Sequence, residues 1–251
     1  MPDEQCLAHM GPLVQGLTAS WPRRSHTLLE LGCGDGKALD LLWPFGFDVT
    51  GVEHSPQLLA QARTRFGYRG DFHLGPCDDA PFDDQSFDYV LIFTAFFHLK
   101  NSEMDAVLAE AVRLASKGVL CIFPNAWSLA RLASMLPGRA RSRLCGSHAL
   151  ATGYNPFTIL RQIWRLGAGR HWNMRGILPG PGATWSAETR FGKAMNSRLL
   201  PGPLGAYVGI RLDVLPLAGM TGLPLRVKAA RLMAGTSPVA TRNAAQGLPE
   251  S

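Results

Sequence analysis

The stretch TLLELGCGDG, residues 27–36, decides the fold of this chain. Its first five residues form a short apolar run, which predicts a buried strand. Three glycines, Gly32, Gly34 and Gly36, follow directly. Glycine is required where a side chain would collide with a ligand or forbid a tight turn. The stretch therefore predicts a strand that ends in a bare turn, able to approach a bound molecule closely.

Strand and helix patterns alternate on the C-terminal side of this turn. The expected strands cover 48–53, 71–74, 87–93 and 118–123, and the expected helices cover 37–43, 56–65 and 102–115. Such alternation is typical of a parallel α/β sheet. A helical lead over 3–19 precedes the first strand. Further along, the pattern predicts helices over 127–135 and 156–166, strands over 171–178 and 205–215, and a mobile tail from 235.

Composition excludes several classes of protein. The chain has 251 residues, 46% of them hydrophobic, which suffices for a substantial core, so the chain as a whole is not a disordered tail. Its five cysteines are an odd number at wide spacings, so they predict reduced thiols rather than a disulfide framework or a metal motif. The segment 199–225 contains Arg211, Asp213 and four prolines, so no bilayer-spanning helix is expected there. With no signal-peptide pattern at the N-terminus, we expect a cytoplasmic protein.

Charge is distributed unevenly along the chain. Residues 1–125 carry 9 Lys and Arg against 16 Asp and Glu, whereas residues 126–251 carry 16 against 3. A basic half of this kind is typical of proteins attracted to an acidic substrate, an anionic membrane surface or nucleic acid. The arginines are scattered singly, however, and this favours a solvated basic surface over a dedicated nucleic-acid or membrane partner.

A carboxylate stands at a position that suits a nucleoside. Glu53 closes the second expected strand, 19 residues after Gly34, where it can accept both hydroxyls of a ribose. Lys37 occupies the place where the dinucleotide fingerprint G-x-G-x-x-G needs its last glycine. This substitution argues against a nicotinamide or flavin cofactor. A nucleoside without a pyrophosphate is the expected ligand.

Several motifs, in order and at family-like spacing, point to one family. They are ELGCGDG at 30–36, VTGVEHSPQLLAQAR at 49–63, APFDDQSFDYV at 80–90, His98, and LASKGVL at 114–120. Over about residues 27–125 the chain resembles the class I methyltransferases that use S-adenosylmethionine. More narrowly, it resembles the small bacterial type often called type 11.

The resemblance implies a fold and a division of the chain. The fold is a Rossmann-like, doubly wound α/β sheet, mostly parallel with an antiparallel last strand, plus a basic, Gly- and Pro-rich C-terminal elaboration. The expected parts are a helical lead over 1–26, a cofactor-binding core over 27–125, a substrate-capping region with the last strands over 126–234, and a flexible tail over 235–251.

The resemblance also implies which residues contact S-adenosyl-L-methionine. The glycine turn would wrap the methionyl part, Glu30 would help hold the amino group and Glu53 would bind the ribose. Relatives usually carry an acid that contacts the adenine amino group, but Pro76 stands there in this chain. Asp78, or the backbone amides of the same loop, would take over that contact. The expected cofactor contacts are Glu30, Gly32, Cys33, Gly34, Gly36, Glu53, His54, Ser55, Cys77, Asp78 and Thr94.

One histidine is the leading candidate for a general base. His98 lies just beyond the fourth expected strand, where the acceptor should meet the cofactor; a pocket-wall histidine that never takes a proton is the alternative. Phe96 and Phe97 would either line the site or pack in the core, and Phe93 is expected in the core. Weaker candidates are Asn125, Trp127, Ser128, His148, Tyr154 and His171.

These features predict an enzyme that methylates an oxygen, nitrogen or carbon atom of a small molecule. An RNA or protein acceptor, bound through the basic half, is the first alternative. Amino-methylating nucleic-acid enzymes usually carry Asn/Asp-Pro-Pro-aromatic after the fourth strand, and this chain has Thr94 to Phe97 there instead. A module that binds the nucleoside without chemistry is the second alternative. A lipophilic acceptor at a membrane surface, approached through residues 199–233, is the third. No metal is expected.

Overall fold

The computed structural model describes residues 4–128, 153–166, 171–177, 200–201 and 205–214. The chain divides into two units, Met1–Pro216 and Leu217–Ser251, and every described residue belongs to the first. Most of the helix expected over 127–135 and the whole tail expected from 235 lie outside the described residues. Within the described part, no helix combines the length and the apolar character needed to cross a bilayer.

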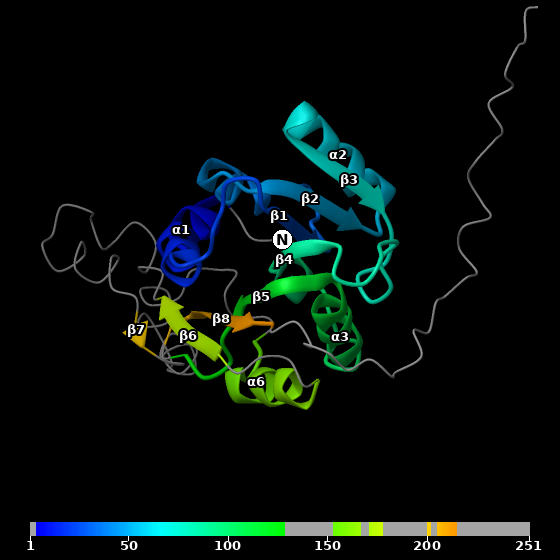
Figure 1. Ribbon diagram of the computed structural model, residues 1–251. Coiled ribbons are helices and arrows are strands. Elements are labelled where there is room, and N and C mark those ends of the chain that lie inside the picture. Colours follow the sequence, from blue (N-terminus) through cyan, green and yellow to red (C-terminus); the bar gives the residue numbers. More distant parts are fainter. Residues whose placement is uncertain (1–3, 129–152, 167–170, 178–199, 202–204, 215–251) are drawn as a thin grey trace, which may run out of the picture. The chain divides into compact units, whose positions relative to one another are not determined.

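One sheet of eight strands organises the described residues (Figure 1). Its strands are β1 (Thr27–Leu31), β2 (Asp48–Glu53), β3 (Gly70–Leu74), β4 (Phe87–Ile92), β5 (Ala115–Pro124), β6 (His171–Ile177), β7 (Leu200–Pro201) and β8 (Tyr207–Asp213). They lie in the order β3-β2-β1-β4-β5-β8-β6-β7. The first five strands of this order pair in parallel, and β8, β6 and β7 join as antiparallel neighbours.

The strand order reverses direction at β1. The chain runs outward from β1 through β2 to β3, then returns to place β4 on the other side of β1. In doubly wound sheets, the crevice outside the carboxyl ends of the strands at such a switch point is where ligands bind. Here the loops that follow Leu31 and Ile92 lie at that switch point. The predicted glycine turn is one of these loops.

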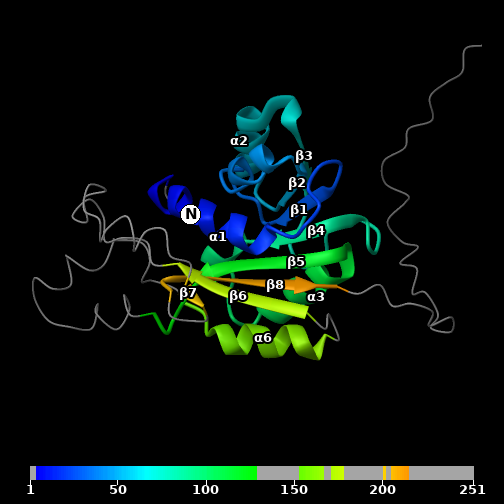
Figure 2. The ribbon, with the colours of Figure 1, turned by 60° about the vertical axis from the view of Figure 1, so that its left-hand side comes forward.

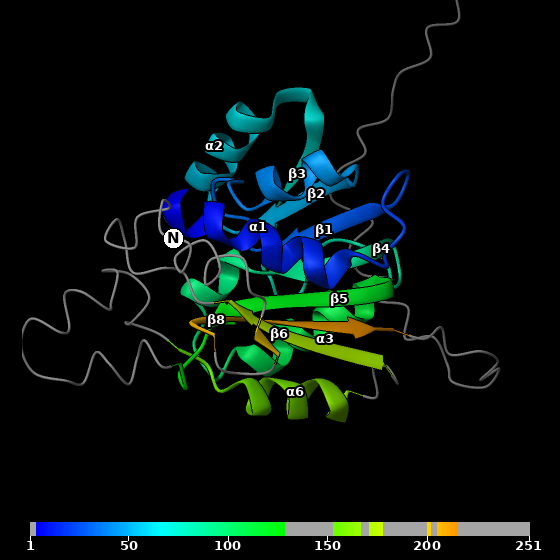
Figure 3. The same ribbon diagram turned by 90° about the vertical axis from the view of Figure 1, so that its left-hand side faces the viewer.

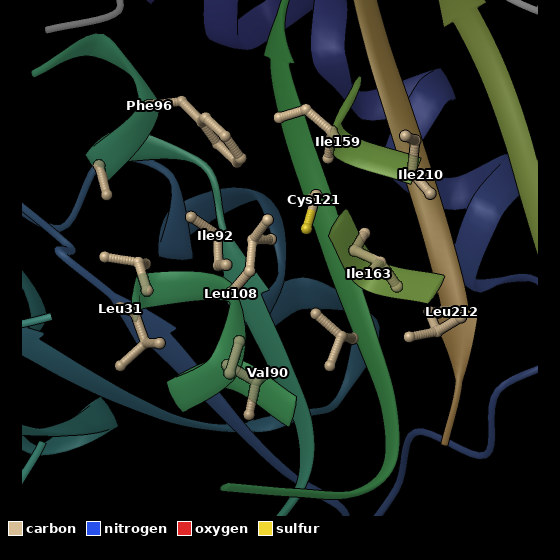
Figure 4. Close-up of a cluster of buried hydrophobic side chains, with 14 of the residues drawn as sticks. Leu31, Val90, Ile92, Phe96, Leu108, Cys121, Ile159, Ile163, Ile210 and Leu212 are labelled. Carbon is tan, nitrogen blue, oxygen red and sulfur yellow. The ribbon is translucent and has the colours of Figure 1, made fainter. Parts of the chain in front are cut away.

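Helices cover both faces of the sheet (Figure 3). On one face α1 (Glu4–Thr18) and α2 (Pro56–Phe66) pack into a buried cluster that includes Leu13, Leu59 and Tyr89. On the other face α3 (Met104–Leu114) and α6 (Pro156–Arg165) cover a second cluster. Figure 4 shows the second cluster, where Leu108 of α3 and Ile163 of α6 lie over strand residues. The expected doubly wound α/β architecture is confirmed.

The helix expected over 37–43 does not form. The structure has two short 3₁₀ turns there, Leu39–Leu41 and Trp43–Phe45. Pro44 explains the difference, because it lacks an amide donor and disfavours the helical conformation of the residue before it. Gly46 then ends the segment with a φ of 89°. Too few residues remain between the glycine turn and Pro44 for a stable helix.

The antiparallel part of the sheet is larger than expected. The predicted last strand is β8, which pairs antiparallel with β5 from Gly118 opposite Asp213 to Pro124 opposite Tyr207. The strand expected over 171–178 forms as β6, and β6 with the unpredicted strand β7 extends the sheet beyond β8. Helix α6, which covers this extension, begins where the Asn155 side chain accepts a hydrogen bond from the Phe157 amide.

Candidate functional site

The last polar residue of β1 is a buried carboxyl group. Glu30 is fully buried, and its Oε1 accepts hydrogen bonds from the Thr94 amide (3.2 Å) and the Thr94 hydroxyl (2.8 Å). Its Oε2 is buried without a hydrogen-bond partner. Burial raises the pKa of this carboxyl to about 8, although the two bonds from Thr94 act in the opposite direction. An unpaired buried oxygen at the switch point is the kind of group that a cationic ligand would satisfy.

The glycine turn packs tightly against the next loop. Gly32 has a φ of +70°, and a Cβ added there would lie 2.8 Å from the Ala95 Cβ and 3.0 Å from the Cys77 sulfur. Any side chain at this position would therefore be strained and would collide with the chain after β4. Gly34 and Gly36 also have positive φ values, 59° and 80°. The bare turn predicted from the sequence is present.

Glu53 ties β2 to the glycine turn. Its Oε2 accepts a hydrogen bond from the Gly34 amide, and its Oε1 accepts one from the Ser55 amide, both at 2.9 Å. His54 Nδ1 lies 2.9 Å from the same Oε1, and the imidazole is mostly exposed. A carboxylate offers about four lone-pair positions, so these contacts leave capacity for a further donor.

The loop after β3, residues 75–80, carries Asp78 and Asp79 and lies beside the glycine turn. The Gly75 amide donates to the Glu53 carbonyl (3.1 Å), and Glu110 fixes the far end by accepting from the Ala80 amide (2.7 Å). Cys77, half-buried, contacts the turn at Gly32, and burial raises the pKa of its thiol to about 12. Asp78 is exposed. The loop is thus held at both ends, with a neutral thiol inside and a carboxylate outside.

The segment after β4 forms a 3₁₀ turn, Thr94–Phe97, that ends at His98. Partial burial lowers the pKa of His98, and the charges of Glu53 and His54 also act on it. His98 follows the carboxyl end of β4, and Glu53 ends the parallel strand β2, so both lie at the same edge of the sheet. Although part of the side chain is desolvated, His98 as a whole is exposed, and its lowered pKa favours the neutral form that can accept a proton.

The two phenylalanines of this turn have different surroundings. Phe96 is completely buried and packs on the rings of Phe123 and Tyr154, with centroid distances of 5.2 and 5.1 Å. Of the two alternatives for Phe96, core packing is the one observed. Phe93 is buried as expected, whereas Phe97 is half-buried. A ligand can meet only Phe97 without opening the core.

Asn125 and Tyr154 act as structural ties at the carboxyl end of β5. The Asn125 side chain donates to the Gly205 carbonyl (2.7 Å) and accepts from the Trp127 amide (2.9 Å). The Tyr154 hydroxyl donates to the Leu99 carbonyl (2.7 Å). Both groups are hydrogen-bonded to the protein's own backbone, and neither offers an unpaired buried atom to a ligand.

The remaining weak candidates fall elsewhere. His171, expected to cap the site, pairs with Asp213, which in turn pairs with Gly118 at the start of β5. This places His171 at the opposite edge of the sheet, because β6 begins opposite Asp213 and runs antiparallel to β8, toward Tyr207 at the edge of the site. Ser128 is buried, Trp127 is exposed, and His148 lies outside the described residues.

Sequence reasoning missed two features of this site. The bond between Glu30 and Thr94 joins residues 64 positions apart, and only the pairing of β1 with β4 reveals it. The contact of Cys77 with the glycine turn likewise depends on how two loops pack. No group of three His, Cys, Asp or Glu side chains within the described residues is arranged to hold a metal ion.

The part of the chain that contains this edge matches a known protein family. Residues 29–123 match the family model of a methyltransferase domain. No curated protein matches the chain.

Solved structures share the fold at low sequence identity. An S-adenosylmethionine-dependent methyltransferase from Thermotoga maritima is similar with a TM-score of 0.57 and 18% identity, over 83% of this chain and 90% of that one. The magnesium protoporphyrin IX methyltransferase of Synechocystis PCC 6803, crystallised with bound S-adenosylmethionine, gives 0.53 and 14%, over 84% and 80%. The geranyl diphosphate C-methyltransferase of Streptomyces coelicolor A3(2) gives 0.55 and 15%, over 84% and 80%.

Proposed function

We propose that this chain is an enzyme that uses S-adenosylmethionine to methylate a small molecule. The proposal is supported by the match of residues 29–123 to the family model of a methyltransferase domain and by a fold shared with solved methyltransferases. The acceptor atom would be an oxygen, nitrogen or carbon nucleophile. The observation that carries the site assignment is the buried, unpaired Oε2 of Glu30 at the switch point of the sheet.

The residues at this edge suit the chemistry of S-adenosylmethionine. The cofactor carries positive charge on its amino and sulfonium groups, and Glu30 offers a carboxyl oxygen that lacks any partner. A Cβ at Gly32 would collide with Ala95 and Cys77, so only glycine keeps this part of the turn bare. Glu53 retains acceptor capacity beside the exposed imidazole of His54. The fit supports this edge as the cofactor site.

We assign the contacts as follows. Glu30 binds the amino group and is oriented by Thr94, which fixes its other oxygen. The glycine turn, including Cys33, surrounds the methionyl part through its backbone. Glu53 accepts the ribose hydroxyls, and His54 with Ser55 flanks the adenine. Cys77 and Asp78 take the place of the adenine-contacting acid that Pro76 replaces.

Bound S-adenosylmethionine supplies a methyl group that is already activated toward nucleophiles. The main tasks of this chain are therefore to orient the acceptor and to exclude water. Orientation alone can lower a barrier by ~7–11 kcal/mol. His98 takes the proton of an acceptor that arrives protonated, because partial burial lowers the pKa of its imidazole and so favours the neutral form that can accept a proton.

A small-molecule acceptor is supported by what structurally similar enzymes act on. A magnesium porphyrin and geranyl diphosphate are the substrates of two of them, and both are compounds of low molecular mass. The acceptor side of this site also has a half-buried aromatic ring, Phe97, next to His98. Together these observations favour an apolar or aromatic compound with an ionisable group.

The first experiment tests the cofactor site by calorimetry with S-adenosylmethionine and its demethylated product. Glu53→Ala is expected to abolish measurable affinity, and Glu53→Gln to weaken it by about 10–100-fold, because the amide keeps one acceptor and loses the charge. Tyr68→Ala, at a fully exposed position, is the control and should bind normally. Unchanged affinity in both Glu53 variants refutes the ribose assignment.

The second experiment identifies the acceptor. The protein is incubated with a cell extract and methyl-labelled S-adenosylmethionine, and extract compounds that gain one methyl group are identified by mass. Label in a low-mass compound supports the proposal; label only in RNA or protein refutes it. Cofactor binding without any transfer would instead favour a binding module. With the acceptor in hand, His98→Gln should lower kcat and leave cofactor affinity unchanged.

A further inference from the structure

Helix α6 exposes aromatic rings on the side that faces away from the sheet. Phe157 is 51% exposed and Trp164 is 61% exposed. They are seven positions apart, so they share one face of the helix. Ile159 and Ile163 point the other way into the core. Figures 2 and 3 show α6 with the sheet on one side and no described element on the other.

A third ring extends this face toward the candidate site. Trp127 is 63% exposed and packs edge-on against Phe157, with ring centroids 6.3 Å apart. It lies two residues beyond Asn125, at the carboxyl end of β5. The three half-exposed rings present on the order of 300 Å² of apolar surface. A patch of that size on a soluble domain is commonly a binding surface.

Two exposed arginines accompany the rings. Arg161 lies one turn from both Phe157 and Trp164, and Arg165 lies next to Trp164; both are exposed. Among the described residues, neither arginine has an ion-pair partner. The sequence explains why, since residues 111–187 contain ten Lys and Arg and no Asp or Glu. A surface that combines rings with unpaired cations is complementary to an anionic, partly apolar partner.

Two classes of partner meet that description, and the balance of the surface favours one. Nucleic acid is bound mainly through phosphates, and strong binders make six to ten such contacts. The helix offers only two cations, Arg161 and Arg165, against three exposed rings. Lipid surfaces are bound through buried aromatic side chains at the headgroup level, with cations adding attraction to anionic lipids. A surface with three exposed rings and two arginines therefore fits a lipid surface better than nucleic acid.

We propose that the face made by Trp127, Phe157, Arg161, Trp164 and Arg165, the α6 face, binds an anionic lipid surface. Trp127 and Phe157 lie at the end of this face nearest to the carboxyl edge of the sheet. The inference does not depend on methyl transfer, and its test contains no methyl donor.

The test measures binding of the full chain to vesicles by flotation. Vesicles of phosphatidylcholine with about 30% phosphatidylglycerol provide the anionic surface, and pure phosphatidylcholine vesicles provide the neutral one. We expect binding to the anionic vesicles at least ~10-fold stronger than to the neutral ones, weakening as salt is raised. Equal binding to both, or none to either, overturns the proposal.

Variants locate the binding surface. The pair Phe157→Ala and Trp164→Ala, and separately the pair Arg161→Glu and Arg165→Glu, should each reduce the partition coefficient by at least ~10-fold. Their unfolding transitions are measured alongside, to confirm that they fold. Tyr68→Ala and Arg24→Glu, at exposed positions on other elements, should bind like the parent. Undiminished binding by folded α6 variants overturns the assignment. The assignment is also overturned if the parent protein does not bind vesicles but binds RNA, and the α6 variants abolish that RNA binding.

Discussion

The two ends of the carboxyl edge of the sheet use polar side chains in different ways. At β1 and β2, Glu30 and Glu53 are buried acids, and one oxygen of Glu30 has no partner. At β5, Asn125 and Tyr154 are equally buried, but their side chains bond to backbone carbonyls of the protein itself. At β1 and β2, one buried carboxyl oxygen still lacks a hydrogen-bond partner. At the end of β5, the polar side chains are already hydrogen-bonded within the protein.

This difference separates binding groups from supporting groups. A buried group that stays unpaired costs free energy in the free protein, so its persistence calls for a role that a ligand completes. A buried group that is fully paired stabilises the fold whether or not a ligand is present. The comparison therefore predicts opposite behaviour for substitutions at the two ends of the edge.

The largest expected effect is the pH dependence caused by Glu30. Its pKa of about 8 lies above the value of 4.5 expected in the unfolded chain, so folding favours the protonated form. The resulting stabilisation is fully present below pH 4.5 and is lost as the pH rises through 8. The loss amounts to roughly 3–5 kcal/mol between these limits.

Glu30→Gln isolates this effect, because glutamine is neutral at every pH and fits the same space. We expect the free energy of unfolding of the variant, measured in urea from pH 5 to 9, to exceed that of the parent increasingly toward pH 9. The same variant should bind S-adenosylmethionine more weakly. A constant difference in stability across the range would show that Glu30 is ionised in the free protein and that the comparison fails.

A smaller effect is expected at the glycine turn. Gly32→Ala places a Cβ 2.8 Å from the Ala95 Cβ at a φ of +70°, so it combines backbone strain with overpacking. We expect a loss of about 2–4 kcal/mol in the free energy of unfolding and loss of cofactor binding by calorimetry. Gly11→Ala is the matched control, since it adds a Cβ with no atom within 4 Å. That change in α1 should stabilise by about 0.5–1 kcal/mol.

The sequence was sufficient to predict the parallel core because that core depends on local patterns. Unbroken apolar runs predicted the strands, and the glycines with Glu53 predicted the turn and its acid. All of these are properties of short segments. The helix over 37–43 was predicted wrongly because the apolar spacing was weighed above Pro44, whose effect on the preceding residue decided the outcome.

The contacts between distant segments could not be predicted in the same way. The pairing of Thr94 with Glu30 and the place of His171 both depend on which strands lie side by side. The burial of Phe96 depends on Tyr154, which comes 58 positions later and packs over it. Polar residues in a loop look alike in sequence whether they face a ligand or a backbone carbonyl. Only the geometry distinguishes them.

The smallest expected effect tests the completed end of the edge. Tyr154→Phe removes the hydrogen bond to the Leu99 carbonyl and leaves the ring packed on Phe96. We expect a loss of about 1 kcal/mol in the free energy of unfolding, with cofactor affinity unchanged by calorimetry. Tyr68→Phe, fully exposed, should change neither quantity. If Tyr154→Phe weakened cofactor binding as strongly as Glu30→Gln, the two ends would not differ in kind. Tyr154 would then belong to the binding site, despite its bond to the backbone.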